Sequence, residues 1–294
     1  MSDPQATLVG AVDRGGGVFA LELESRSANL YFEVNASTGG RITAFGVGGR
    51  NLLTGPDVNA INWGSTFWPS PQVWPWPPDP AFDSAPYAAR IDGSSVLMRS
   101  PVARVDRVGT FTVIKRFSPD LKRLAVDVEY TIRNDGDSTI RVAPWEVTRV
   151  PKEGLSFFPA GEGIVRSGLA TTERAGVVWL LGSSDVITEP SSPKLFADGA
   201  EGWLAHAASG MLFLKCFPKI PVARQARPDE AEIEIYVHPT DGYIELEPQG
   251  ALIELAAGTS SSWTVTWVAR VLPAGLAPAI GSGQLLGWVR SLVR

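Results

Sequence analysis

Residues 232–249 read Glu232-Ile233-Glu234-Ile235-Tyr236-Val237-His238, then Pro239-Thr240-Asp241-Gly242, then Tyr243-Ile244-Glu245-Leu246-Glu247-Pro248-Gln249. Apolar and polar residues alternate strictly in both arms, which is the period of a β-strand, so the segment predicts an antiparallel hairpin. The apolar face carries Ile233, Ile235, Val237, Ile244 and Leu246, and the polar face carries Glu232, Glu234, Tyr236, His238, Tyr243, Glu245, Glu247 and Gln249. If the four-residue turn closes the hairpin symmetrically, the facing pairs are His238 with Tyr243, Tyr236 with Glu245, Glu234 with Glu247, and Glu232 with Gln249.

The polar face of this hairpin gathers four carboxylates on one patch, and like charges that face each other destabilise a sheet. The acids can lie on a solvated outer face, or they can belong to a binding site. The tyrosines, histidine and glutamine between them favour a sugar site, because sugar hydroxyls take hydrogen bonds and the apolar ring face stacks on aromatic rings. A divalent cation such as Ca²⁺ held by the same oxygens is a further possibility.

The composition excludes several classes of function. The 294 residues carry 26 Lys and Arg against 31 Asp and Glu, a net charge of -5 without a basic run, so neither nucleic acid nor a membrane is an expected partner. The one cysteine, Cys216, has no internal disulfide partner, and with two histidines no Cys/His metal site is expected. We therefore predict no cofactor and assign no metal ligand, and the sequence leaves open whether a divalent cation binds the acidic patch. The N-terminus lacks a charged start followed by an apolar segment, and no stretch has membrane-spanning length, so we expect a cytoplasmic protein.

Strand patterns fill most of the chain. Residues 18 to 272 read as strands separated by Gly- and Pro-rich turns, and helical spacing appears only in the last twenty or so residues. No strand–helix–strand rhythm is present, which excludes a parallel α/β fold. The sequence predicts a flexible lead-in over 1–17, one all-β domain over 18–272 that forms a large antiparallel sandwich, and a tail over 273–294 with a short helix. It leaves the oligomeric state open.

A second informative segment is rich in tryptophan and proline. Residues 62–79 contain four Trp and five Pro, and they include Asn62, Trp68 and Gln72. Because proline fixes the backbone, we expect a stiff loop whose aromatic side chains lose little entropy on binding a ring. The alternative is a proline-braced loop that folds over the end of the sandwich with its tryptophans packed inward. Both can hold at once.

Two further segments supply candidate residues. In a strand over 141–149, Trp145, Val147 and Arg149 share one side, and Glu146 and Thr148 share the other. This strand can contribute to a site, or it can be an ordinary surface strand with salt bridges. Gly39-Gly40 precedes Arg41 at the start of another strand, and Arg41 could pair with the hairpin carboxylates. Arg149 or Lys215 could also offset their charge.

The order of these segments resembles the galactose mutarotase-like β-supersandwich group, and within it the DUF4380 family. The resemblance spans roughly residues 25–270 and is carried by Gly39-Gly40-Arg41-Ile42, Trp63-Gly64-Ser65-Thr66-Phe67-Trp68-Pro69-Ser70-Pro71-Gln72, Trp145-Glu146-Val147-Thr148-Arg149, Gly202-Trp203-Leu204-Ala205 and Tyr243-Ile244-Glu245-Leu246-Glu247. It implies an all-β supersandwich and a mono- or oligosaccharide ligand on its concave sheet.

The resemblance also implies roles for individual residues. In aldose 1-epimerases a late strand carries the general base in a Leu-Glu-Thr-Gln motif, and Leu246-Glu247-Pro248-Gln249 matches three of its four residues, so Glu247 is the implied base. Those enzymes use a mid-chain histidine as the acid, whereas this chain has Pro144-Trp145-Glu146 there, so Glu146 is the candidate replacement. The candidate substrate-binding residues are Arg41, Asn62, Trp68, Gln72, Trp145, Arg149, His238 and Glu245.

The functional hypothesis is a sugar-converting enzyme related to aldose 1-epimerases that uses glutamate acid/base chemistry. Crowded carboxylates suit this chemistry, because neighbouring negative charge raises the pKa of a glutamate towards the working pH. Two alternatives stay open: a non-catalytic carbohydrate-binding module, and a glycoside hydrolase that uses two glutamates.

Overall fold

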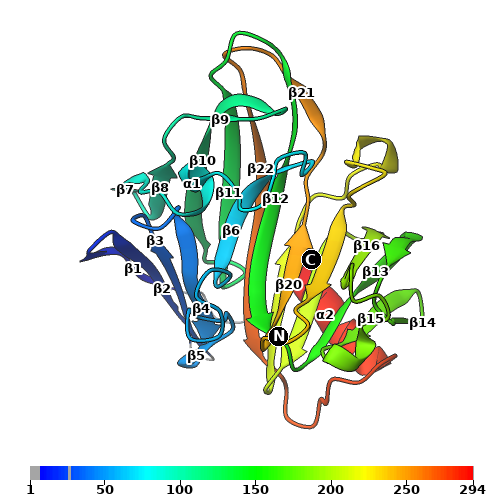
Figure 1. Cartoon of the computed structure of the whole chain (residues 1–294). Coiled ribbons are helices and arrows are strands. Elements are labelled where there is room, and N and C mark those ends of the chain that lie inside the picture. Colours follow the sequence, from blue (N-terminus) through cyan, green and yellow to red (C-terminus); the bar gives the residue numbers. More distant parts are fainter. Residues whose placement is uncertain (1–6, 26–27, 294) are drawn as a thin grey trace.

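The computed structural model describes residues 7–25 and 28–293, and its strands form two facing antiparallel layers (Figure 1). The first layer has the strand order β1 (Thr7–Gly15), β2 (Val18–Glu24), β3 (Asn29–Asn35), β4 (Arg41–Val47), β6 (Ser65–Ser70), β12 (Ile140–Pro151), β20 (Tyr243–Pro248), β19 (Ile233–Val237) and β16 (Lys194–Gly199). The predicted hairpin is β19 and β20, so it lies inside this layer and pairs on both sides.

The second layer has the strand order β7 (Ala88–Asp92), β8 (Ser95–Arg99), β10 (Gly109–Asp120), β11 (Ala125–Asn134), β22 (Ser260–Val271), β18 (Met211–Cys216), β17 (Trp203–Ala208), β13 (Leu155–Ser167), β15 (Val177–Leu181) and β14 (Thr172–Arg174). Strand β13 belongs to both layers, because its first half pairs with β15 and β17 and its second half pairs with β16. The predicted all-β antiparallel supersandwich is confirmed.

The remaining elements are short. They are β5 (Arg50–Asn51) beside β4, β9 (Ala103–Val105) beside β10, β21 (Ile253–Leu255) beside β12, helices α1 (Pro80–Asp83) and α2 (Gly283–Val293), and single 3-10 turns at Ser184–Val186 and Val222–Arg224. None of the helices in residues 7–25 and 28–293 has both the length and the apolar character needed to cross a membrane.

An aromatic cluster holds the two layers together. Trp267 of the second layer lies with its ring centroid 5.9 Å from that of Phe32 and 5.3 Å from that of Phe45, both in the first layer. The apolar face of the predicted hairpin, from Ile233 to Leu246, points into the same core, where its side chains are completely buried. Burial of each such side chain stabilises the fold by roughly 1.5–3 kcal/mol.

The hairpin register agrees with the prediction. Glu234 lies opposite Glu247, Tyr236 lies opposite Glu245, and Ile235 lies opposite Leu246. The backbone N–H of His238 donates to the carbonyl oxygen of Tyr243, which closes the turn end as expected. The polar face is therefore one continuous surface on the side of the first layer that faces away from the aromatic core.

The two ends of the chain differ in how well they were predicted. The C-terminal helix is present as α2, and it buries Leu285, Leu286 and Val289 on the face of the second layer opposite the aromatic core. The expectation of a flexible lead-in does not hold for Thr7–Gly15, which forms β1 and pairs with β2 along its length. The sequence pattern failed there because edge pairing supplies the order that the glycine-rich segment lacks by itself. Residues 1–6 lie outside the described residues.

Candidate functional site

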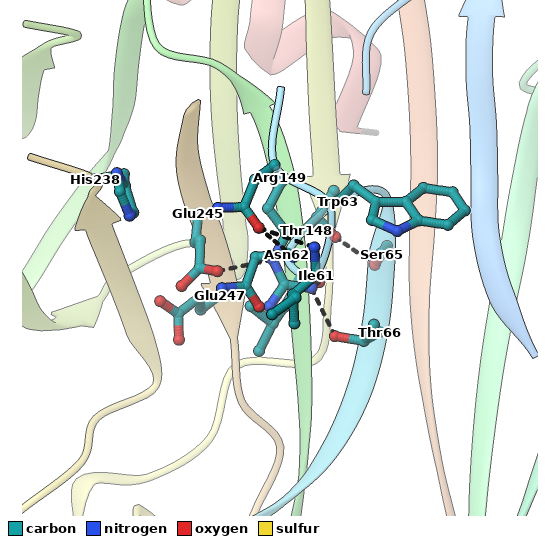
Figure 2. Close-up of polar contacts among 12 residues, drawn as sticks. Ile61, Asn62, Trp63, Ser65, Thr66, Thr148, Arg149, His238, Glu245 and Glu247 are labelled. Atoms are coloured by element: carbon teal, nitrogen blue, oxygen red, sulfur yellow. Dashed lines mark hydrogen bonds and ion pairs between the residues drawn. The ribbon is translucent and has the colours of Figure 1, made fainter. Parts of the chain in front are cut away.

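A row of four polar side chains crosses four neighbouring strands of the first layer. Lys194 of β16 lies opposite Tyr236 of β19, Tyr236 lies opposite Glu245 of β20, and Glu245 lies opposite Arg149 of β12. Because facing residues of adjacent strands point to the same side of a sheet, these side chains all belong to the polar face. Figure 2 shows Glu245 beside Arg149, with Glu247 further along the same strand.

A cavity of about 320 Å³ opens over this row. It is lined by Asn62, Trp68, Gln72, Trp76, Trp145, Lys194, Tyr236, His238, Tyr243 and Glu245. The hairpin and the Trp–Pro segment, more than 150 residues apart in the sequence, thus share one hollow. Glu245 is only 8% exposed and Glu234 and Glu247 are fully buried, so the solvated outer face is the wrong interpretation.

Tryptophan rings form one wall of the cavity. The ring centroid of Trp68 lies 5.3 Å from those of both Trp76 and Trp145, with interplanar angles of 78° and 76°. The indole N–H of Trp68 donates to Asp83 over 3.0 Å, which fixes its ring. Trp68 and Trp74 are packed inward, as the second interpretation of the loop expects, while Trp76 is 52% exposed. The wall offers fixed aromatic faces at little entropic cost.

Arg149 and Glu245 form a buried ion pair on the cavity side of the sheet. Arg149 Nε donates to Glu245 Oε1 over 2.7 Å, and Arg149 Nη1 donates to Thr66 Oγ1 over 2.8 Å. The guanidinium carbon lies 4.9 Å from the ring centroid of Trp68. Arg149 Nη2 is buried and has no hydrogen-bond partner among the described residues. The pair fixes the Glu245 carboxylate, whose residue lines the cavity.

A second charged group lies beside the first and contains two carboxylates. Lys194 Nζ lies 2.7 Å from Glu234 Oε2 and 2.8 Å from Glu247 Oε2. Burial raises the pKa of Glu234 and of Glu247, and the charge of Lys194 opposes this effect without cancelling it. The charge of Glu247 adds to the rise for Glu234, and the charge of Glu245 adds to the rise for Glu247. Glu247 Oε1 and Glu234 Oε2 are both buried without a hydrogen-bond partner among the described residues.

Glu247 therefore contacts a residue that lines the cavity, but it does not line the cavity itself. Its side chain is completely buried behind Lys194 and does not line the hollow. His238 does line it, with its ring centroid 4.8 Å from that of Tyr243. The backbone N–H of Asp241 donates to His238 Nδ1 over 2.8 Å, which leaves the proton of a neutral imidazole on Nε2.

Two candidate residues lie elsewhere. Glu146 projects from the opposite face of β12, where Lys215 Nζ lies 2.7 Å from its Oε1 and Tyr130 donates to its Oε2 over 2.7 Å. It is completely buried between the layers and cannot reach a ligand in the cavity. Arg41 pairs with Asp83 over 3.2 Å and donates to the carbonyl oxygen of Ile61 over 2.9 Å, so it does not pair with the hairpin carboxylates.

Sequence analysis did not identify Lys194, which is the cation that pairs with Glu234 and Glu247 of the hairpin. It lies forty residues before the hairpin and reaches it through the pairing of β16 with β19. Only the strand order of the sheet could have identified it. Among residues 7–25 and 28–293, no group of three or more His, Cys, Asp and Glu side chains is arranged to hold a metal ion.

The two-layer antiparallel architecture is the fold of galactose mutarotase-like structures. The chain belongs to the DUF4380 family, whose model, described as a domain of unknown function, matches residues 70–270. A search of the curated proteins finds no match.

Solved structures agree on the fold. The galactose mutarotase related enzyme from Lactobacillus acidophilus is 8% identical with a TM-score of 0.59, and the match covers 88% of this chain and 100% of that one. A candidate aldose 1-epimerase from Klebsiella pneumoniae is 9% identical with a TM-score of 0.58, and the match covers 96% of this chain and 86% of that one. A TPR-domain containing protein from Parabacteroides distasonis is 12% identical with a TM-score of 0.53; the match covers 88% of this chain but only 50% of that one. At these identities the similarity shows the fold alone.

Proposed function

We propose that this protein binds a free sugar in the cavity over the hairpin. One observation carries the proposal: fixed tryptophan faces and hydrogen-bonding side chains, among them Glu245, His238 and Asn62, line the same hollow of about 320 Å³. That volume falls at the lower end of the range for small-molecule sites, which suits a single sugar ring. The polar groups would fix the hydroxyls while Trp76 and Trp145 cover the apolar ring face.

Isothermal calorimetry with glucose, galactose, mannose and xylose tests sugar binding. The Trp76→Ala variant removes an exposed ring of the wall, and we expect it to weaken binding by about tenfold without loss of stability. Trp288→Ala is the matched control, because Trp288 belongs to α2, which packs on the far layer. Absence of binding by every one of these sugars would refute the proposal.

A second candidate function is interconversion of the sugar's anomers. It is favoured by a carboxylate, Glu245, and an imidazole, His238, that line the same cavity. A base must lie within hydrogen-bond reach of the proton that it removes. We therefore give this role to Glu245 rather than to the buried Glu247 that the resemblance implies.

In this reaction Glu245 takes the proton of the anomeric hydroxyl, whose O–H electrons form the C1 carbonyl. The bond from C1 to the ring oxygen breaks, and the ring oxygen takes the proton from His238 Nε2; the imidazolate left behind accepts the hydrogen bond of the Asp241 N–H at Nδ1. Rotation about C1–C2 and return of both protons close the ring on its other face. Polarimetry or NMR exchange measures the rate of anomer interconversion. A rate increase by the parent protein that is lost in Glu245→Gln and in His238→Asn, while both variants still bind the sugar, supports conversion. Binding without any exchange leaves the protein a carbohydrate-binding module.

We do not propose glycoside hydrolysis. That chemistry needs two carboxylates that flank one bond, and Glu245 is the one carboxylate among the described residues that line the cavity. The cytoplasmic location stays a prediction.

A further inference from the structure

Lys194 is held from three sides. Its ammonium lies 2.7 Å from Glu234 and 2.8 Å from Glu247, which face each other across the hairpin. On the third side, Nζ lies 4.8 Å from the ring centroid of Trp145, which lines the cavity. An ammonium held by two charges and an aromatic face has little freedom to rotate away.

The two carboxylates are themselves held firmly. Glu234 Oε1 accepts hydrogen bonds from the backbone N–H of Ala231 over 3.0 Å and from Gln249 Nε2 over 2.9 Å. Gln249 Oε1 in turn accepts from Ser70 over 2.9 Å, in the middle of the Trp–Pro segment. The position of Lys194 is thus fixed relative to both walls of the cavity.

Hydrogen-bond accounting leaves one donor of Lys194 unassigned. An ammonium carries three N–H donors and no acceptor. Glu247 Oε2 accepts one of them over 2.8 Å, and Glu234 Oε2 lies 2.7 Å from Nζ as an ion-pair partner; no hydrogen bond from Nζ to any other described residue accounts for the third. The side chain is 18% exposed and lines the cavity, so the exposed part faces the space where a ligand would lie.

Lys194 is also protonated near neutral pH. Burial alone would lower its pKa, but the charges of Glu234 and Glu247 and their hydrogen bonds outweigh burial and hold the pKa well above its ordinary value. The group therefore stays an ammonium at any pH at which the protein is studied near neutrality.

We propose that Lys194 is a ligand-contacting residue whose third N–H donates to an oxygen of the bound sugar, and that Glu234 and Glu247 are positioning residues that hold the ammonium there. The inference rests on the proposed sugar binding. It gives Glu247 a function that fits its burial: it acts on the ligand through Lys194.

A merely structural lysine would neutralise the two buried carboxylates without touching the ligand. Lys219 provides the comparison, because it bridges Asp198 over 2.7 Å and Glu232 over 3.4 Å at the other end of the same sheet and does not line the cavity. Both lysines link two acids, and only Lys194 faces the hollow.

The experiment measures sugar binding by calorimetry in Lys194→Met, Lys194→Arg and Lys219→Met, with the tightest-binding member of the glucose, galactose, mannose and xylose set. We expect Lys194→Met to weaken binding by about 10- to 100-fold, as the loss of a charged hydrogen bond does, and Lys194→Arg to restore part of it. Lys219→Met should change binding by less than about twofold. Equal affinities of Lys194→Met and the parent protein would overturn the inference while sugar binding itself stands.

A second measurement does not depend on a stable variant. In the parent protein labelled with ¹⁵N-lysine, a saturating concentration of the same sugar should shift the Nζ resonance of Lys194 and leave that of Lys219 in place. A Lys194 resonance that the sugar does not move would also overturn the inference. If none of the four sugars binds the parent protein, the proposed function fails first and the inference fails with it.

Discussion

Replacement of Glu146 by glutamine removes the countercharge of a lysine that has no contact with water. Lys215 Nζ lies 2.7 Å from Glu146 Oε1, and both side chains are completely buried between the two layers. Burial already lowers the pKa of Lys215 to about 8 despite the neighbouring carboxylate. In Glu146→Gln the folded protein must either bury the Lys215 ammonium without a countercharge or bury Lys215 as a neutral amine.

The expected cost follows from this geometry. Breaking a buried pair by removing one partner typically destabilises a protein by about 3–5 kcal/mol. The hydrogen bonds from Lys215 to Thr148 Oγ1 at 2.6 Å and to the Leu246 carbonyl at 3.2 Å remain, which favours the lower end of the range. For a chain of this size such a loss lowers the melting temperature by on the order of 10 °C.

The assay is urea denaturation of four proteins: the parent, Glu146→Gln, Lys215→Met and the double variant. We expect the double variant to recover at least about 2 kcal/mol of the loss in Glu146→Gln, because it no longer buries a charge. Glu146 raises the pKa of Lys215, so in Glu146→Gln this pKa falls below the value of about 8 that it has in the parent protein. Between that lowered pKa and pH 8 the unfolded variant binds more protons than the folded variant, so the variant gains stability with rising pH while the parent does not, and the deficit of Glu146→Gln should narrow as the pH is raised towards 8.

Two outcomes would refute this reasoning. One is a loss below about 1 kcal/mol in Glu146→Gln, which would mean that water reaches the pair. The other is strictly additive losses in the double variant. The same proteins test the site assignment, since the double variant should still bind sugar if Glu146 lies outside the cavity as the structure shows.

Other predictions concern the backbone, the acid range and the helix. In Gly39→Ala the new Cβ would lie 2.2 Å from the carbonyl oxygen of Asp83 at a φ of +65°, so we expect a larger loss of stability than the roughly 1 kcal/mol for Gly48→Ala, where φ is +60° and the space is open. Burial lowers the pKa of His206 to about 4 from 6.5, so stability is lost as the pH falls through that window. In His206→Gln, urea midpoints measured at the two ends of the window should differ less than in the parent. Leu285→Ala on α2 should cost about 2–5 kcal/mol by thermal unfolding, because the side chain is completely buried.

The parts of the fold that sequence reasoning predicted well are local. Alternation assigns each hairpin side chain to a face, and the four-residue turn fixes which residues oppose each other, so Glu234 and Glu247 were paired correctly. The same rule correctly separated Arg149 from Glu146 on the two sides of one strand. It could not say which side faces the cavity, because β12 is a central strand covered on both faces.

The choice of charge partners was beyond local reasoning. Arg41 was a possible partner of the hairpin carboxylates, but it pairs with Asp83, the last residue of α1. Lys194 became the partner of two hairpin glutamates because β16 docks on β19, and strand order depends on the packing of the whole sandwich. A resemblance could suggest Glu247 as a functional residue, but only coordinates show that a lysine stands between it and the hollow.

Strand β13 has a consequence for how the molecule comes apart. The first half of β13 forms backbone hydrogen bonds with β15 and β17. Its second half pairs with β16, the strand that carries Lys194. Separation of the two layers would therefore break backbone hydrogen bonds of β13. Thermal unfolding should therefore be one cooperative transition. Destabilisation of β15 or β17 should also affect the cavity that Lys194 lines.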